Sequence, residues 1–191
     1  MKGIPKKKYF NDLARLYGSN TIVLRGQGTD PTSLVEYAIK IFLNGRQGNS
    51  RIERISAKNF PPRIFDNIFI VFDEDEKPDE RNKAIAIIEE FSSKHKKVKI
   101  TACDSRPNFE LWILLHFEKL QPHAYTISDI DKKLRRHMEN YSKSMDGLLS
   151  LIENQTSFAK ENAKFLRDSI QREENDCFTN VDFLVEHCQK G

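Results

Sequence analysis

The first hundred residues alternate between short apolar runs and amphipathic stretches. Four segments have the continuous or alternating apolar pattern that predicts a strand: 21–25, 51–57, 68–72 and 98–102. The stretches 31–43 and 79–94 carry their apolar residues on one face, which predicts two helices. Strands that alternate with helices are typical of a parallel sheet flanked by helices. We therefore expect an α/β fold for this half.

The rest of the chain carries a helical pattern. Apolar residues lie all round the stretch 107–118, so we expect a buried helix with Pro107 at its first position. Further helices are expected at 127–140, 145–152, 157–173 and 179–188. We expect no strand after residue 102. The sequence thus predicts one domain, with an α/β core at about 20–104 and a helical region at about 105–191 packed on it.

Charge is abundant, but the net charge is small. Of the 191 residues 31% are charged and 38% are apolar, with a net charge of +3. That total does not by itself indicate a nucleic-acid partner, but the basic residues are clustered, as at 6–8, 94–99 and 132–136. Each cluster can contact phosphate or can simply be solvated surface, and both interpretations stay open.

The expected cellular location rests on sequence features that are missing. The three cysteines have no spacing typical of a metal site, which favours reduced thiols. Neither an apolar leader nor a run of about 20 apolar residues is present, so we expect no signal peptide, no membrane span and a cytoplasmic location.

The clearest chemical pattern is the run IFIVFDEDE. Side chains alternate along a strand, so Asp73 and Asp75 are expected on one side and Glu74 on the other. The carboxyl ends of strands are where open α/β sheets bind ligands, and two carboxylates there suit Mg²⁺. Alternatively, the acidic residues only end the strand and begin a solvated loop.

A second pattern is TIVLRGQGTDP, in which a strand, a glycine turn and a helix start follow one another. This order indicates an anion or metal site, but no Gly-Lys-Ser/Thr follows, so it is not a P-loop. Arg25 can grip a phosphate with its guanidinium group. Asp30 can act chemically or can be only the N-cap of the helix that begins at Pro31.

The third pattern is PNFELWILLHF. On a helical wheel Glu110 shares a face with apolar residues and needs a partner there, although an acidic residue also suits a first helical turn. Trp112 and His116 share the opposite face, and His116 is either a hydrogen-bonded core residue or a ligand.

Taken in order, these segments resemble the RloB family, TOPRIM-like proteins found beside restriction and anti-phage defence genes. IVLRGQGTDP is similar to the family's first strand and loop, VFDEDE to its Asp-x-Asp strand, and PNFELWILLHF to its Pro-x-Phe-Glu-x-Trp segment. YSK at 141–143 and NDCFTNVDFLVEH near residue 180 resemble weaker features. The resemblance implies a TOPRIM-like parallel sheet flanked by helices.

The resemblance also implies a site in which Asp73 and Asp75 hold Mg²⁺ or Mn²⁺. A glutamate after the first strand usually exchanges protons, but Arg25 stands there and can neither accept a proton nor bind a metal ion. Asp30 can substitute for it, and Glu110 is a candidate supporting acid. The expected substrate contacts come from Arg25 with three further residues: Gly26, Lys97 and Lys99.

Three functions remain open at this point. The first is a Mg²⁺-dependent nuclease of a prokaryotic anti-phage system that cuts DNA or RNA such as tRNA, acts with an ATPase encoded nearby and can form a homo-oligomer. The second is a catalytically inactive module of a defence complex that binds nucleic acid or protein, and the third is a purely structural subunit of such a complex. Arg25 favours both of these over catalysis. Whether the chain is an enzyme is therefore undecided from sequence.

Overall fold

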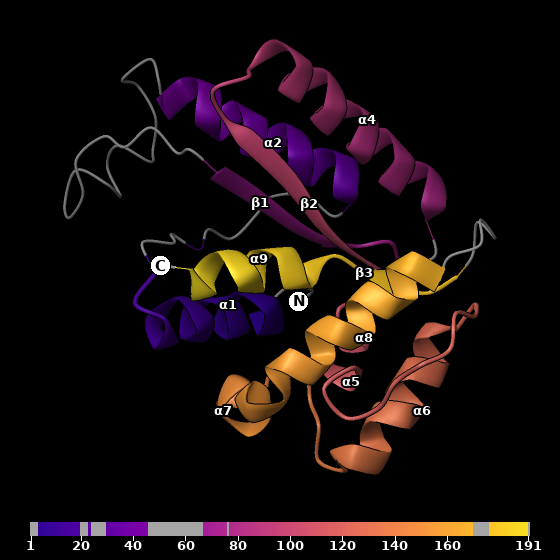
Figure 1. The fold of residues 1–191 in the computed structure, drawn as a ribbon. Coiled ribbons are helices and arrows are strands. Elements are labelled where there is room, and N and C mark those ends of the chain that lie inside the picture. The colour runs from indigo at the N-terminus through magenta and orange to yellow at the C-terminus, as the bar shows by residue number, and fades with distance from the viewer. Residues whose placement is uncertain are drawn as a thin grey trace. The chain divides into compact units, whose positions relative to one another are not determined.

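The computed structural model describes residues 4–19, 23, 30–45, 67–75, 77–169 and 176–190 (Figure 1). It divides into two compact units, each assembled from separate stretches of chain. Unit 1 comprises residues 1–25, 71–76 and 103–191, and unit 2 comprises residues 26–70 and 77–102. The predicted single domain, with its core at about 20–104, stays a prediction.

Unit 2 contains the two helices that the first half predicts, α2 (Pro31–Gly45) and α4 (Pro78–Lys94). The Asp30 side chain caps α2 by accepting the N–H of Ser33 at 2.8 Å. The two helices pack together through Phe42 and Phe91, whose rings meet edge to face at 5.8 Å. Both predicted helices are therefore confirmed.

The described residues form a mixed sheet of three strands in the order β1 (Asn67–Asp73), β2 (Lys99–Arg106) and β3 (Phe178–Thr179). The arrows of β1 and β2 point the same way in Figure 1, and β3 runs antiparallel to β2. The α/β class is thus confirmed, but a wholly parallel TOPRIM-like sheet is not. The predicted strands 21–25 and 51–57 lie outside the described residues.

The expectation of no strand after residue 102 is wrong at two places. Strand β2 continues to Arg106, and β3 pairs Thr179 with Ser105 in the part predicted to be wholly helical. A strand of two residues is too short to show a period of two. A buried hydroxyl contact at 2.8 Å between Ser105 and Thr179 accompanies the pairing.

The helices of unit 1 largely follow the predicted pattern. They are α1 (Ile4–Leu16), α5 (Glu110–Leu114), α6 (Ile127–His137), α7 (Leu148–Ile152), the 3₁₀ turn η1 (Glu153–Gln155), α8 (Thr156–Ser169) and α9 (Val181–Gln189).

Helix α5 is the buried centre of this unit. Leu111 to Leu115 are fully buried, as the all-round apolar pattern predicts, and α5 packs against α6, α8 and β3. The predicted bounds of 107–118 are too wide, because Pro107 lies three residues before the helix begins. At the other end, the N–H groups of His116 and Phe117 bond three residues back, which tightens and ends the helix.

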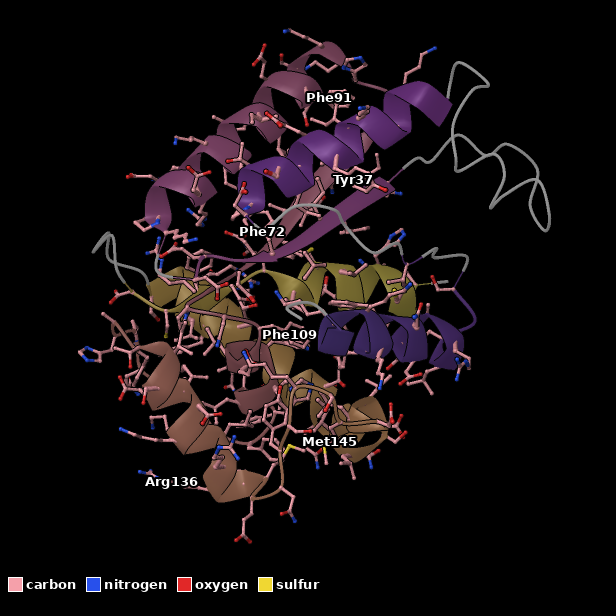
Figure 2. All side chains as sticks on the ribbon, turned by 180° about the vertical axis from the view of Figure 1, so that it is seen from behind. Tyr37, Phe72, Phe91, Phe109, Arg136 and Met145 are labelled. Carbon is pink, nitrogen blue, oxygen red and sulfur yellow. The ribbon has the colours of Figure 1, made fainter. Side chains whose placement is uncertain are left out.

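Helix α1 was not among the predicted elements. It buries Tyr9, Phe10 and Leu13 and packs against α7 and α9. The Tyr9 ring meets Phe109 edge to face at 5.4 Å, and Phe109 is labelled beside this helix in Figure 2. These contacts fix α1 as part of the core of unit 1.

Candidate active site

Strand β1 ends in an acidic residue that is largely buried. The side chain of Asp73 is only 17% exposed, and its Oδ2 atom lies 2.6 Å from the ammonium nitrogen of Lys6. Its Oδ1 atom is buried and has no hydrogen-bond partner among the described groups. A buried carboxylate oxygen without a partner is costly, so this atom marks a position suited to a cation or a hydrogen-bond donor.

Two other carboxylates act on Asp73. Burial is the largest cause that raises the pKa of Asp73; the Lys6 ammonium opposes it, and the negative charges of Asp75 and Glu110 add to it. Such couplings require the carboxylates to lie within electrostatic reach of one another. The structure therefore brings together three residues singled out from sequence, here called the acidic cluster: Asp73, Asp75 and Glu110.

A turn, rather than strand alternation, positions Asp75. The chain leaves β1 directly after Asp73, and Asp75 adopts a left-handed conformation with a φ of +48°. Its N–H donates to the carbonyl oxygen of Pro107 at 3.1 Å, which fixes the turn against the segment leading to α5. Aspartate tolerates this conformation better than most residues with a side chain.

Glu74, between the two aspartates, has a different partner. Its Oε2 atom lies 2.7 Å from Nε of Arg106 at the end of β2, and both side chains are largely buried. The Arg106 guanidinium also lies over the Phe178 ring of β3, 5.2 Å from its centroid. Glu74 thus ties the turn after β1 to the two neighbouring strands.

Glu110, the first residue of α5, is 4% exposed and has two partners from the YSK segment. Its Oε1 atom lies 3.0 Å from Nζ of Lys143 and accepts the Tyr141 hydroxyl at 3.3 Å. Burial would lower the pKa of Lys143, but the charges of Glu110 and the two aspartates raise it overall. The predicted need for a partner is met by these two residues, whose part in the site the sequence did not reveal.

The sequence does not single out Lys6 either, because there it is only one member of a basic cluster. Helix α1 places it at Asp73, and Tyr9 on the same helix accepts the indole N–H of Trp112 at 2.9 Å. The apolar residues Tyr9 and Leu13, four positions apart, are a helical signal that could have indicated α1. Nothing local could have indicated that Lys6 meets Asp73.

The remaining predicted residues lie outside the described residues or belong to unit 2, whereas the acidic cluster belongs to unit 1. Arg25 and Gly26 lie outside the described residues. Asp30 belongs to unit 2 and is the N-cap of α2, one of its two expected roles. Lys97 and Lys99 also belong to unit 2, where their side chains are exposed.

The residues fit a divalent cation only in part. Within the described ranges, no three His, Cys, Asp or Glu side chains are grouped so that they could hold a metal ion. Mg²⁺, however, often takes only one or two protein carboxylates and keeps several waters. The three carboxylates with Lys6 and Lys143 leave one formal negative charge, and Asp73 offers an unpartnered oxygen. The donor set therefore suits a hydrated Mg²⁺ better than a metal enclosed by protein ligands.

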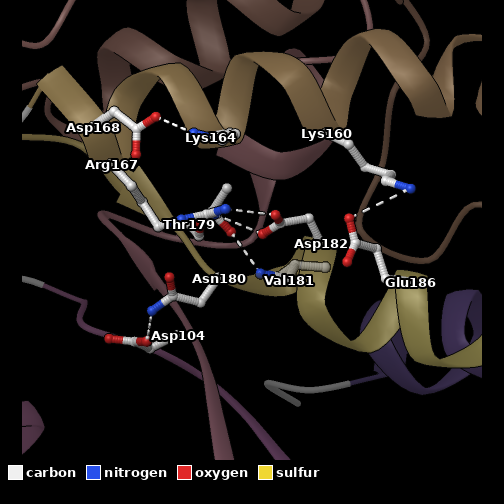
Figure 3. Close-up of polar contacts among 10 residues, drawn as sticks. All are labelled: Asp104, Lys160, Lys164, Arg167, Asp168, Thr179, Asn180, Val181, Asp182 and Glu186. Atoms are coloured by element: carbon white, nitrogen blue, oxygen red, sulfur yellow. Dashed lines mark hydrogen bonds and ion pairs between the residues drawn. The ribbon is translucent and has the colours of Figure 1, made fainter.

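A second polar cluster lies on β3 and α9 (Figure 3). Arg167 of α8 makes two contacts of 2.6 Å to the carboxylate of Asp182, and its Nη1 also donates to the carbonyl oxygen of Thr179. Asn180 donates from its side-chain amide to Oδ1 of Asp104 at 2.6 Å. These five residues fasten the C-terminal strand and helix to β2 and α8, so the NDCFTNVDFLVEH segment has a structural role here.

The model of one protein family, described as RloB-like protein, matches residues 6–188. The chain belongs to the RloB-like family. No curated protein and no solved structure matches this RloB-like chain. Among its described helices, none is long and apolar enough to cross a membrane. The matched region of the RloB-like chain includes the acidic cluster and both lysines that pair with it.

Proposed function

We propose that this RloB-like chain is a Mg²⁺-dependent nuclease. The observation that carries the proposal is the buried, unpartnered Oδ1 of Asp73 at the end of β1, beside the charges of Asp75 and Glu110. Protein sites that keep a carboxylate oxygen poised in this way are suited to bind a hard cation. When bound, the ion would stabilise negative charge on the phosphoryl oxygens.

Each residue of the site has a separate task in this proposal. Asp73 and Asp75 hold the ion, and Glu110 is the supporting acid. Tyr141 and Lys143 fix the orientation of Glu110 through their contacts with its Oε1 atom. Arg25 contacts a substrate phosphate because its guanidinium group can bind phosphate but not metal.

Exposed basic residues supply the contacts to the nucleic-acid backbone. On α6, Lys132 and Arg136 are exposed, and Figure 2 labels Arg136 on the outer side of this helix. In unit 2, Lys97 and Lys99 are exposed as well. Ammonium and guanidinium groups on an exposed surface pair with backbone phosphates, which favours a salt-sensitive interaction without base recognition.

The biological setting is proposed from the family. RloB-like proteins resemble components of anti-phage defence, so we place this chain in the cytoplasm of a prokaryotic cell with an ATPase partner that controls cutting. DNA and RNA, including tRNA, both remain candidate substrates. Self-association into a homo-oligomer belongs to the same proposal.

An inactive binding module is the second candidate, and one contact favours it. The Lys6 ammonium already lies 2.6 Å from Asp73 Oδ2, so a protein cation neutralises part of the site. Together with Arg25 in the place of the family's glutamate, this ion pair would suit a chain that binds nucleic acid or a partner protein without cutting.

The test is a cleavage assay with matched variants. Purified protein, with and without the ATPase, is incubated with tRNA, single-stranded DNA and plasmid in Mg²⁺, Mn²⁺ or EDTA. We expect metal-dependent cleavage that Asp73→Asn abolishes and Asp168→Asn preserves, because Asp168 is an exposed residue paired with Lys164. Cleavage that persists in Asp73→Asn, or no cleavage under any condition, would exclude the nuclease.

A further inference from the structure

The two lysines of the acidic cluster differ in how they are held. Lys143 is 64% exposed and shares Glu110 with the Tyr141 hydroxyl. Lys6 is only 21% exposed, and its ammonium pairs with one carboxylate of the described residues, that of Asp73. Lys6 also lies 6.0 Å from the centroid of the Phe109 ring. Lys6 is therefore an internal cation of the site rather than a surface charge.

We infer that Lys6 is a resident counter-ion that a divalent cation must displace from Asp73. This inference rests on the proposed metal-dependent function and names the residue that sets the metal affinity of the site. Lys6 pairs with Oδ2 while Oδ1 of the same carboxylate has no partner. A cation that binds this carboxylate meets the positive charge of Lys6 a few ångströms away, so the two compete.

The geometry allows the side chain to leave without moving its helix. Helix α1 is fixed by buried Tyr9 and Leu13 and by the hydrogen bond from Trp112 to Tyr9. The lysine ammonium sits on a flexible four-carbon stem, so rotation within that stem can withdraw the charge. Displacement is therefore a change of one side chain, with α1 remaining in place.

The charge balance explains why such a counter-ion is useful. Without Lys6, the acidic cluster and Lys143 would carry two formal negative charges in a largely buried place, which is costly in the absence of a metal ion. With Lys6 in place, the metal-free site carries only one formal negative charge, which lowers the cost of burying it. Once displaced, the ammonium is a free hydrogen-bond donor of the kind that pairs with phosphate oxygens.

The experiment measures Mn²⁺ binding by electron paramagnetic resonance of the free ion, at one ionic strength for all variants. We expect Lys6→Met and Lys6→Gln to bind Mn²⁺ on the order of 10-fold more tightly than wild type. Lys6→Arg retains the positive charge, so its affinity for Mn²⁺ should remain as weak as that of wild type. The matched control is Lys8→Met, from the same helix, because Lys8 pairs with the exposed Asp146 at 2.5 Å and should leave the affinity unchanged. Asp73→Asn should bind no ion at the site.

The outcomes separate this inference from the proposed function. If wild type binds Mn²⁺ through Asp73 and the Lys6 variants bind it equally, the inference is overturned and the metal site stands. If no variant binds Mn²⁺, both fail. If the neutral Lys6 variants bind and wild type does not, Lys6 is a permanent occupant, which overturns both displacement and the nuclease proposal.

A second measurement uses wild-type protein and does not depend on how the variants fold. Amine acetylation, read by mass spectrometry, reports how available each lysine is. We expect labelling of Lys6 to rise severalfold when Mg²⁺ or Mn²⁺ is added, while labelling of Lys8 stays constant. Unchanged Lys6 labelling under conditions where the ion is bound at Asp73 would overturn displacement.

Discussion

Acid should destabilise unit 1 through His116, a residue outside the acidic cluster. His116 is 1% exposed, and its Nδ1 lies 2.9 Å from the carbonyl oxygen of Trp112. A carbonyl only accepts, so Nδ1 carries the hydrogen and the neutral ring leaves Nε2 bare. Nε2 is buried with no partner among the described groups, so protonation there would bury a charge without an acceptor.

The size of the effect follows from the pKa. Burial lowers the pKa of His116 from 6.5 to about 4. Between these values the unfolded chain binds a proton that the folded protein does not, so the free energy of unfolding falls as the pH falls. The full difference is about 3 kcal/mol at about 1.4 kcal/mol per pKa unit, and roughly 2–3 kcal/mol of it is lost between about pH 7.5 and about pH 4.5.

Urea unfolding at a series of pH values measures this directly. The chain has a single tryptophan, Trp112, whose ring lies 4.8 Å from His116, so its fluorescence reports unfolding of this region. Other groups titrate too, so the comparison is with His116→Asn, which keeps a donor near the Trp112 carbonyl and cannot take up the proton. His123→Asn is the matched control at an exposed histidine.

The expected result is a difference between two pH profiles. Wild type and His123→Asn should lose about 2–3 kcal/mol more than His116→Asn between about pH 7.5 and about pH 4.5. If the three proteins lose stability in parallel over this range, the assignment of a buried neutral His116 is wrong.

Three further outcomes are expected. Trp112→Ala should lower the free energy of unfolding by roughly 3–5 kcal/mol because the indole is fully buried, and an unchanged thermal melt would contradict this. Arg167→Met should lower the free energy of unfolding by roughly 3–5 kcal/mol, because it leaves the buried Asp182 carboxylate unpaired. Lys164→Met, on the exposed side of the same helix, should lower it by less than about 1 kcal/mol. Equal melting temperatures of the two variants would refute this distinction. Affinity for a single-stranded oligonucleotide should fall steeply between about 50 and about 200 mM salt, and a salt-independent affinity in a filter-binding assay would exclude backbone contacts.

Local pattern predicted the elements that are long and periodic. Helices α2, α4 and α8 have a clear apolar face over three turns or more, and each begins within one residue of its predicted start. The short elements were harder to predict from sequence, because α5 has five residues and β3 has two. Their bounds depend on tertiary contacts, such as the pairing of Ser105 with Thr179, that no local window contains.

The site shows the same division between local and distant information. Asp73 and Asp75 could be predicted because they lie at and just beyond the end of an apolar strand, and Glu110 because it lies on an apolar helix face. Lys6 and Lys143 could not, since each reaches its carboxylate from a distant part of the chain. The sequence therefore indicates the acidic residues of the candidate site, while the lysines that pair with them become evident only in the fold.

The way unit 1 is assembled from separate stretches has a consequence for protein synthesis. Tyr9 and its partner Trp112 are 103 residues apart, and Lys8 and Asp146 are 138 apart. At about 5–20 residues per second, Trp112 is made roughly 5–20 s after Tyr9. Throughout that interval α7 and α9, against which α1 packs, have not been made, and 13 residues are too few for a stable isolated helix. The nascent N-terminal segment thus exposes an apolar helix face that a chaperone on the ribosome would protect.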